Sequence, residues 1–177
     1  MEIYEPRRTP MKVVGVVLVI LSCSAFGVNM AGKLRERAKF LHSLVRGLTI
    51  LRNELCSSLI TVGEALKLLS DKDRGPAHEF FAQCRLNFET VPFKTAWTAA
   101  ALSGSRWGMD SEECGILAGL GDVIGRYDAE KQKELIDKVS EYFAERARFA
   151  DEENRRQYKL RTALGVGSGL MLAVLLL

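Results

Sequence analysis

The sequence has few of the residues from which catalytic and metal-binding sites are usually built. It contains 2 histidines among 177 residues, His42 and His78, and neither has cysteines or carboxylates at the spacing of a metal site. A CxxC pair, a Walker A loop, a GxSxG motif and an HExxH motif are also missing from it. We therefore expect a protein that is not an enzyme and that uses no cofactor or metal.

Cysteine and proline are also rare, and neither sign of charge is in large excess. One of the 4 cysteines, Cys23, lies in an apolar run, and Cys56, Cys84 and Cys114 form an odd, widely spaced set that argues against a disulfide framework. The 25 basic residues nearly balance the 22 acidic ones, which argues against a nucleic-acid partner. With only 4 prolines and no useful stretch that alternates with a period of two residues, the chain is predicted to be all-α.

Two long apolar runs are what the sequence does contain, and the first begins close to the N-terminus. The run from Val13 to Gly32 has no charged residue over 20 positions and follows a polar tail of residues 1–12. A helix of that length spans roughly 30 Å, the thickness of the hydrocarbon core of a bilayer. We predict a transmembrane helix over residues 13–32. The alternative is a signal peptide that places a lipid on Cys23 and so anchors an exported helical binding protein.

The second run, from Thr162 to Leu177, has 16 uncharged residues, or roughly 24 Å of helix, and is predicted to be a second transmembrane helix. Gly165 and Gly169 form a GxxxG motif, through which membrane helices of a homo-oligomer could approach closely. Eight basic residues border the segment between the two runs, against three in the N-terminal tail. By the positive-inside rule, this central segment is predicted to be cytoplasmic.

The central segment, residues 33–161, is predicted to fold as a compact bundle of about six helices. Its last helix is expected to begin near Ala129 and to continue as an exposed stalk over residues 151–161. In the first part of the central segment, an apolar residue recurs every seven positions. This is the pattern of a helix with one buried face, and its members are Leu34, Leu41, Leu48, Leu55, Val62 and Leu69.

Helix starts can be placed from the spacing of capping residues. Thr61 and Glu64 have the spacing of a capping box, and the acidic stretch from Asp110 to Glu113 offers another helix start. Asp128 is a predicted N-cap for the last helix. Between the predicted helix starts at Asp110 and Asp128, glycines are dense enough to predict a close helix crossing. These glycines are Gly115, Gly119, Gly121 and Gly125.

The stretch LGDVIGRYDAEKQ, residues 120–132, carries glycine, aspartate and glutamine at regular spacing. Together with the opening KVVGVVLVI, the basic heptad helix that follows it and the Ala96-Trp97 pair, this stretch resembles the stage III sporulation protein AB family of endospore-forming bacteria. Leu120 and Ile124 replace the phenylalanine and the leucine of the family's pattern, and both changes keep an apolar residue. The remaining positions of that pattern fall on Gly121, Gly125, Asp128 and Gln132.

The resemblance implies a structural role rather than a catalytic one. Such proteins are similar to the inner-membrane platform proteins of type II secretion and type IV pilus systems, whose cytoplasmic domain is a compact helical bundle. The implied partners are the other proteins of the stage III sporulation complex, among them a secretion-type ATPase, stage III sporulation protein AA. The implied setting is the mother-cell membrane around the forespore, at the channel that joins the two cells.

The residues expected to serve that role fall into two sets. The partner surface is predicted on the exposed faces around Glu54, Glu64 and the turn from Arg126 to Asp128. The four motif residues are predicted to serve either helix crossing and capping or the same interaction: Gly121, Gly125, Asp128 and Gln132.

Overall fold

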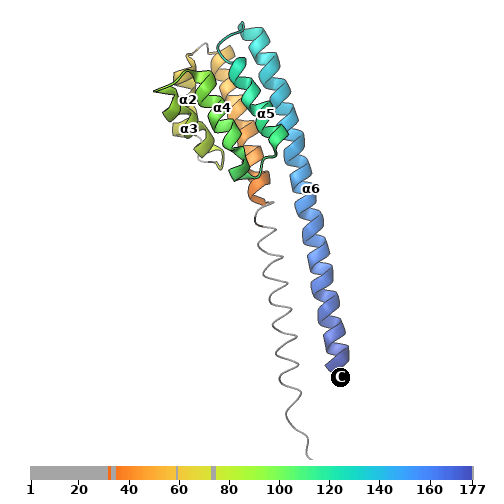
Figure 1. The fold of residues 1–177 in the computed structure, drawn as a ribbon. Helices are drawn as coiled ribbons and strands as arrows, with labels where there is room; N and C mark the ends of the chain where they lie inside the picture. The colour runs from red at the N-terminus through yellow and green to blue at the C-terminus, as the bar shows by residue number, and fades with distance from the viewer. Residues whose placement is uncertain (1–31, 33–34, 59, 73–74, 177) are drawn as a thin grey trace, which may run out of the picture. The chain divides into compact units, whose positions relative to one another are not determined.

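The computed structural model describes residues 32, 35–58, 60–72 and 75–176, and these are drawn as a coloured ribbon in Figure 1. Among them it has six α-helices and no strand, which confirms the prediction of an all-α chain. The tail and nearly all of the first predicted span, residues 13–32, lie outside the described residues. Among the described residues, no helix is both long enough and apolar enough to cross a membrane.

The first helix covers residues 35–56 and is followed by five more α-helices along the chain. Two short 3-10 helices, Ser103–Trp107 and Leu120–Asp122, lie on either side of the fifth α-helix. The labelled helices are α2 (Val62–Lys72), α3 (His78–Phe88), α4 (Phe93–Leu102), α5 (Ser111–Gly119) and α6 (Ala129–Leu176).

The chain divides into two compact units, and the helical bundle is the unit formed by Leu34–Arg155. Helix α6 runs without a break through the boundary at Arg155 and through the predicted stalk over residues 151–161. Most residues from 151 to 160 are exposed. The predicted second span, residues 162–177, continues α6 as helix as far as Leu176.

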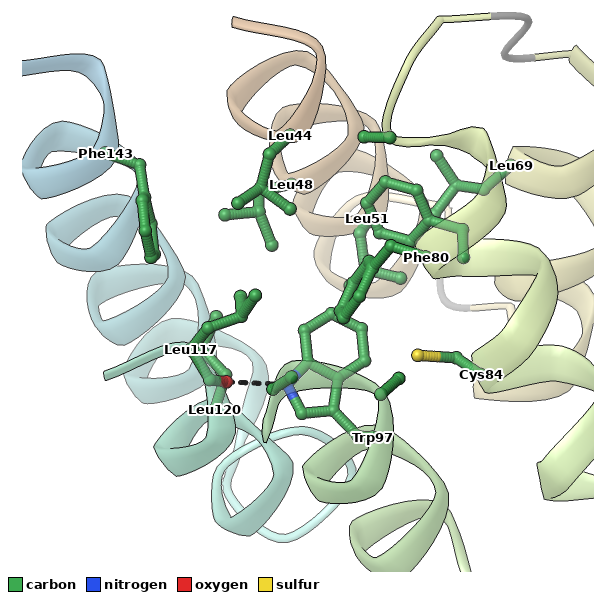
Figure 2. Packing of buried hydrophobic residues seen from close by; sticks show 14 of the residues in the cluster. Leu44, Leu48, Leu51, Leu69, Phe80, Cys84, Trp97, Leu117, Leu120 and Phe143 are labelled. Carbon is green, nitrogen blue, oxygen red and sulfur yellow. Dashed lines mark hydrogen bonds between the residues drawn. The ribbon is translucent and has the colours of Figure 1, made fainter. Parts of the chain in front are cut away.

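The first helix contributes much of the core because its leucines are buried. Figure 2 shows the heptad residue Leu48, with Leu44 and Leu51 of the same helix, near aromatic residues of the neighbouring helices. Gly47, on the same helix, allows a close approach by α3, since a methyl group there would lie 2.3 Å from Cε2 of Phe81. The buried residues of this helix include Phe40, Leu41, Leu44, Leu48, Leu51 and Leu55.

Trp97 on α4 joins three helices through the largest buried side chain of the bundle. Its ring packs edge-on against Phe80 of α3, with the ring centroids 5.0 Å apart. Its indole Nε1–H donates a 2.7 Å hydrogen bond to the carbonyl oxygen of Leu117 on α5, as Figure 2 shows. This bond satisfies a polar group that would otherwise be costly to bury.

The glycines of α5 correct one expectation from the sequence. Gly115 and Gly119 are exposed, and a methyl group at either would have no atom within 4 Å, so the predicted close crossing is wrong there for the described bundle. The reason is that Cys114 and Leu117 carry the buried face of α5. The close approach occurs at Gly121, where a methyl group would lie 3.2 Å from Cδ1 of Trp97.

Candidate functional site

The motif stretch forms a tight turn between α5 and α6 at one end of the bundle. Gly125 has a φ of 80°, a left-handed conformation that favours glycine. Its backbone N–H donates a 2.7 Å hydrogen bond to Oε1 of Gln132, whose side chain is buried. Asp128 accepts a 2.9 Å bond from the backbone N–H of Lys131 and thereby caps the start of α6, as the sequence predicts.

This turn packs against the end of the first helix and the start of α2. The Nε2 atom of Gln132 lies 3.9 Å from Sγ of Cys56, the last helical residue before the turn at Ser57. A methyl group at Gly125 would lie 3.6 Å from Cγ2 of Val62, the first residue of α2. The four motif residues therefore build a turn that holds three helix ends together.

Ion pairs stiffen the outer side of the turn. The carboxylate of Asp122 lies 2.7 Å from Nζ of Lys94 on α4 and 3.4 Å from Nη1 of Arg126. The hydrogen bond from Lys94 is the main reason that the pKa of Asp122 is lowered. Arg126 is 68% exposed, so most of its guanidinium stays available to a partner.

The two predicted acidic contacts have different environments. The Glu64 carboxylate accepts hydrogen bonds from the backbone N–H of Thr61 at 2.9 Å and from its hydroxyl at 2.8 Å, which confirms the predicted capping box. These two bonds lower the pKa of Glu64. Glu54 is half-buried near the end of the first helix, and within the described chain no side chain pairs with its carboxylate. The structure thus brings the elements that carry Glu54, Glu64 and Arg126 to one end of the bundle.

Tyr127 belongs to this end of the bundle and lies within the turn from Arg126 to Asp128, where the sequence predicts part of the partner surface. Its side chain is 54% exposed at the turn, between Arg126 and the capping residue Asp128. We define the docking end as Glu54, Glu64, Arg126 and Tyr127.

A buried ionic cluster at the other end of the bundle escaped the sequence analysis. The fully buried Glu113 of α5 accepts 2.7 Å bonds from Nη2 of Arg37 and from Nε of Arg146, and a 2.9 Å bond from the backbone N–H of Asp110. Arg146 also contacts Asp110 at 2.5 Å. The capping bond from the Glu113 N–H is the main cause of the lowered pKa of Asp110.

This ionic cluster ties the first helix, α5 and α6 together, and its partners satisfy a carboxylate that could not otherwise be buried. The sequence does not predict this cluster, because Arg37 is 76 residues from Glu113. No group of three or more metal-ligating side chains occurs within the described residues. His42 contacts Asp151 at 2.8 Å and His78 contacts the carbonyl of Ser70 at 2.9 Å, so both histidines join separate segments of the chain.

Comparison with known proteins points to one family. The family model described as stage III sporulation protein AB matches residues 12–177. A solved structure titled "Stage III sporulation protein AB (SpoIIIAB)" is similar, with a TM-score of 0.57 and 17% identity, over 68% of this chain and 97% of that chain. At this identity the likeness to the solved structure shows the fold alone. No curated protein matches the sequence.

Proposed function

The chain belongs to the stage III sporulation protein AB family, and from that premise we propose that it is a non-catalytic membrane platform of the channel between mother cell and forespore. Family membership gives it a role in sporulation. In this proposal, two transmembrane helices anchor the chain in the mother-cell membrane around the forespore. The bundle faces the mother-cell cytoplasm and docks the secretion-type ATPase, stage III sporulation protein AA, through the docking end.

The observation that carries this proposal is the placement of the docking end within the bundle. The first helix and α6 run antiparallel, because His42 contacts Asp151 and Arg52 contacts Asp137. Residues 35 and 155 are therefore at one end of the bundle and the docking end is at the other. The 22 residues of the first helix separate these two ends by about 30 Å. A partner could bind the docking end without approaching the segments that lead to the predicted spans.

The sequence supports the membrane part of the proposal. The runs over residues 13–32 and 162–177 are free of charge, and basic residues border the bundle on both sides. The bundle is suited to a fixed platform because its docking end is built from capped helix ends and a hydrogen-bonded turn. Binding surfaces on such rigid elements lose little conformational entropy when a partner docks.

A pull-down of the ATPase by the full-length chain tests the docking end. Arg126→Glu reverses an exposed charge, and Glu64→Gln removes a charge while keeping the capping box, because glutamine serves in that position as well as glutamate. We expect each change to weaken binding, and Arg126→Glu to do so about tenfold or more, the effect typical of an interface hot spot. Arg148→Glu on α6 is the matched control, since Arg148 is exposed and distant from the docking end.

Two results would count against the proposal. If both docking-end variants bind the ATPase as well as the unchanged chain does, the ATPase site lies elsewhere on the protein. A mature chain whose mass shows that it begins at Cys23 refutes the platform and supports a lipid-anchored exported protein.

A further inference from the structure

The part of α6 that leads to the second predicted span carries a run of basic residues. The stretch NRRQYKLR, residues 154–161, has four basic side chains and no acidic one. The structure describes the side chains of the first three, which are exposed and make no ion pair or hydrogen bond with another described side chain. We define the basic collar as Arg155, Arg156, Lys159 and Arg161.

The acidic residues of this part of α6 all precede the collar. They are Asp151, Glu152 and Glu153, and the first of them contacts His42 at 2.8 Å. At a rise of ~1.5 Å per residue, these three carboxylates start roughly 14–17 Å along the helix from the predicted span at residue 162, and the collar starts within roughly 11 Å of it. Charge therefore separates along the helix axis, with the basic residues next to the predicted span.

Two exposed side chains with apolar surface lie between members of the collar. Tyr158 is 70% exposed and Leu160 is 55% exposed. Tyrosine is enriched where headgroups meet hydrocarbon, because its ring is apolar and its hydroxyl is polar. Tyr158 precedes the predicted span by four residues, or roughly 6 Å of helix, and each headgroup layer of a bilayer is roughly 5–8 Å thick. The height of Tyr158 along α6 therefore fits a headgroup layer.

We propose that the basic collar binds the phosphate groups of anionic lipids, while Tyr158 and Leu160 lie at the boundary between headgroups and hydrocarbon. The inference rests on the membrane anchoring proposed above. An anionic leaflet attracts basic residues beside a span, and the attraction falls off within a Debye length, so it favours the collar over more distant bases. The exposed apolar surface within the collar favours a lipid over a nucleic acid as its partner.

Native mass spectrometry of the full-length chain in micelles of an uncharged detergent tests this site. The probes are phosphatidylglycerol, which is anionic, and phosphatidylcholine, which carries no net charge. The collar variant replaces the three described members by glutamine, a good helix former: Arg155→Gln, Arg156→Gln and Lys159→Gln. We expect its affinity for phosphatidylglycerol to be at least tenfold lower than that of the unchanged chain, and its affinity for phosphatidylcholine to be equal.

A second triple variant is the matched control, because it removes the same number of positive charges from exposed positions outside the collar. Its changes are Lys67→Gln, Lys133→Gln and Arg148→Gln. We expect it to bind phosphatidylglycerol as tightly as the unchanged chain does. Thermal unfolding of both variants, followed by circular dichroism, checks that the bundle remains folded.

Several results would overturn the inference. Equal affinity of the collar variant and the unchanged chain for phosphatidylglycerol removes the collar from lipid binding. An equal loss in both triple variants assigns the effect to the net charge of the chain. Displacement of phosphatidylglycerol by the same concentration of inorganic phosphate, or tighter binding of a single-stranded oligonucleotide, shows that the collar's ligand is not a lipid.

The membrane anchoring is tested separately by alkaline carbonate washing of vesicles that contain the full-length chain. If the chain stays in the vesicles and the collar variant binds phosphatidylglycerol normally, only the lipid site is refuted. A chain that is washed out refutes the membrane platform and, with it, the premise of the lipid site.

Discussion

Arg146 on α6 donates a 2.7 Å hydrogen bond from Nε to Oε1 of Glu113, whose side chain is fully buried at the start of α5. The same oxygen accepts a bond from Arg37 on the first helix. A single carboxylate therefore fixes three helices to one another at the end of the bundle opposite the docking end.

Replacing Glu113 by alanine should destabilise the bundle by about 3 kcal/mol. The change leaves two arginines without their shared partner and removes one half of a capping box. The value is at the lower end of the range for broken buried pairs because Arg37 and Arg146 keep some contact with water. Urea unfolding of the full-length chain measures the difference. Glu112→Ala, at the exposed neighbouring position, should change stability by about 0.5 kcal/mol or less.

Gly47→Ala should cost about 2 kcal/mol or more, because the new methyl group would lie 2.3 Å from the ring of the fully buried Phe81. Either the ring or the whole of α3 has to move away. A thermal unfolding midpoint equal to that of the unchanged chain would show that α3 does not pack closely on the first helix at this point.

Gly115→Ala should have the opposite effect and stabilise the bundle by about 0.5–1 kcal/mol. The position is exposed, has open space for a methyl group and lies inside α5, where alanine is the better helix former. The measurement is the same urea titration. A loss of stability would mean that the outer face of α5 is covered in the full-length chain.

The bundle should lose stability as the pH falls below about 4, in part through Asp110. The Glu113 N–H holds the pKa of Asp110 below its usual value of 3.8. The unfolded chain therefore takes up the proton first, so this contribution is present above that value and is lost as the pH falls through the lowered pKa of the folded state. Asp110→Asn keeps an effective N-cap but removes the titration.

The expected result for Asp110→Asn is a shallower loss of stability than in the unchanged chain as the pH falls below about 4. Unfolding free energies measured in urea at several pH values provide the comparison. Equal slopes for the two chains would show that Asp110 is not held by the capping box in solution.

Local patterns predicted much of the secondary structure because the interactions behind them span few residues. The capping box of Thr61 and Glu64 and the cap at Asp128 follow from spacing alone, since each joins groups three residues apart. Pro92 directly precedes α4, where a fixed φ and a missing N–H suit the start of a helix. Pro76 is two residues before α3, because Ala77 still belongs to the preceding turn.

The candidate site was predictable only in part. Motif spacing singled out Gly121, Gly125, Asp128 and Gln132, but their common purpose, a turn that joins three helix ends, depends on the contact of Gln132 with Cys56. The same limit explains the wrong expectation for Gly115 and Gly119. Glycine density shows that a helix could approach closely, and only the packing of the helices shows whether one does.

The sequence by itself determined the helical class and most helix starts, because periodicity and capping act over one or two turns of chain, and its motifs indicated the family by resemblance. Only the tertiary structure decided that Arg37, Glu113 and Arg146 share one buried charge cluster. It also decided that Glu54, Glu64 and Arg126 lie on elements gathered at one end of the bundle. Such groupings depend on which helix faces pack together, and that is set by the burial of the whole core.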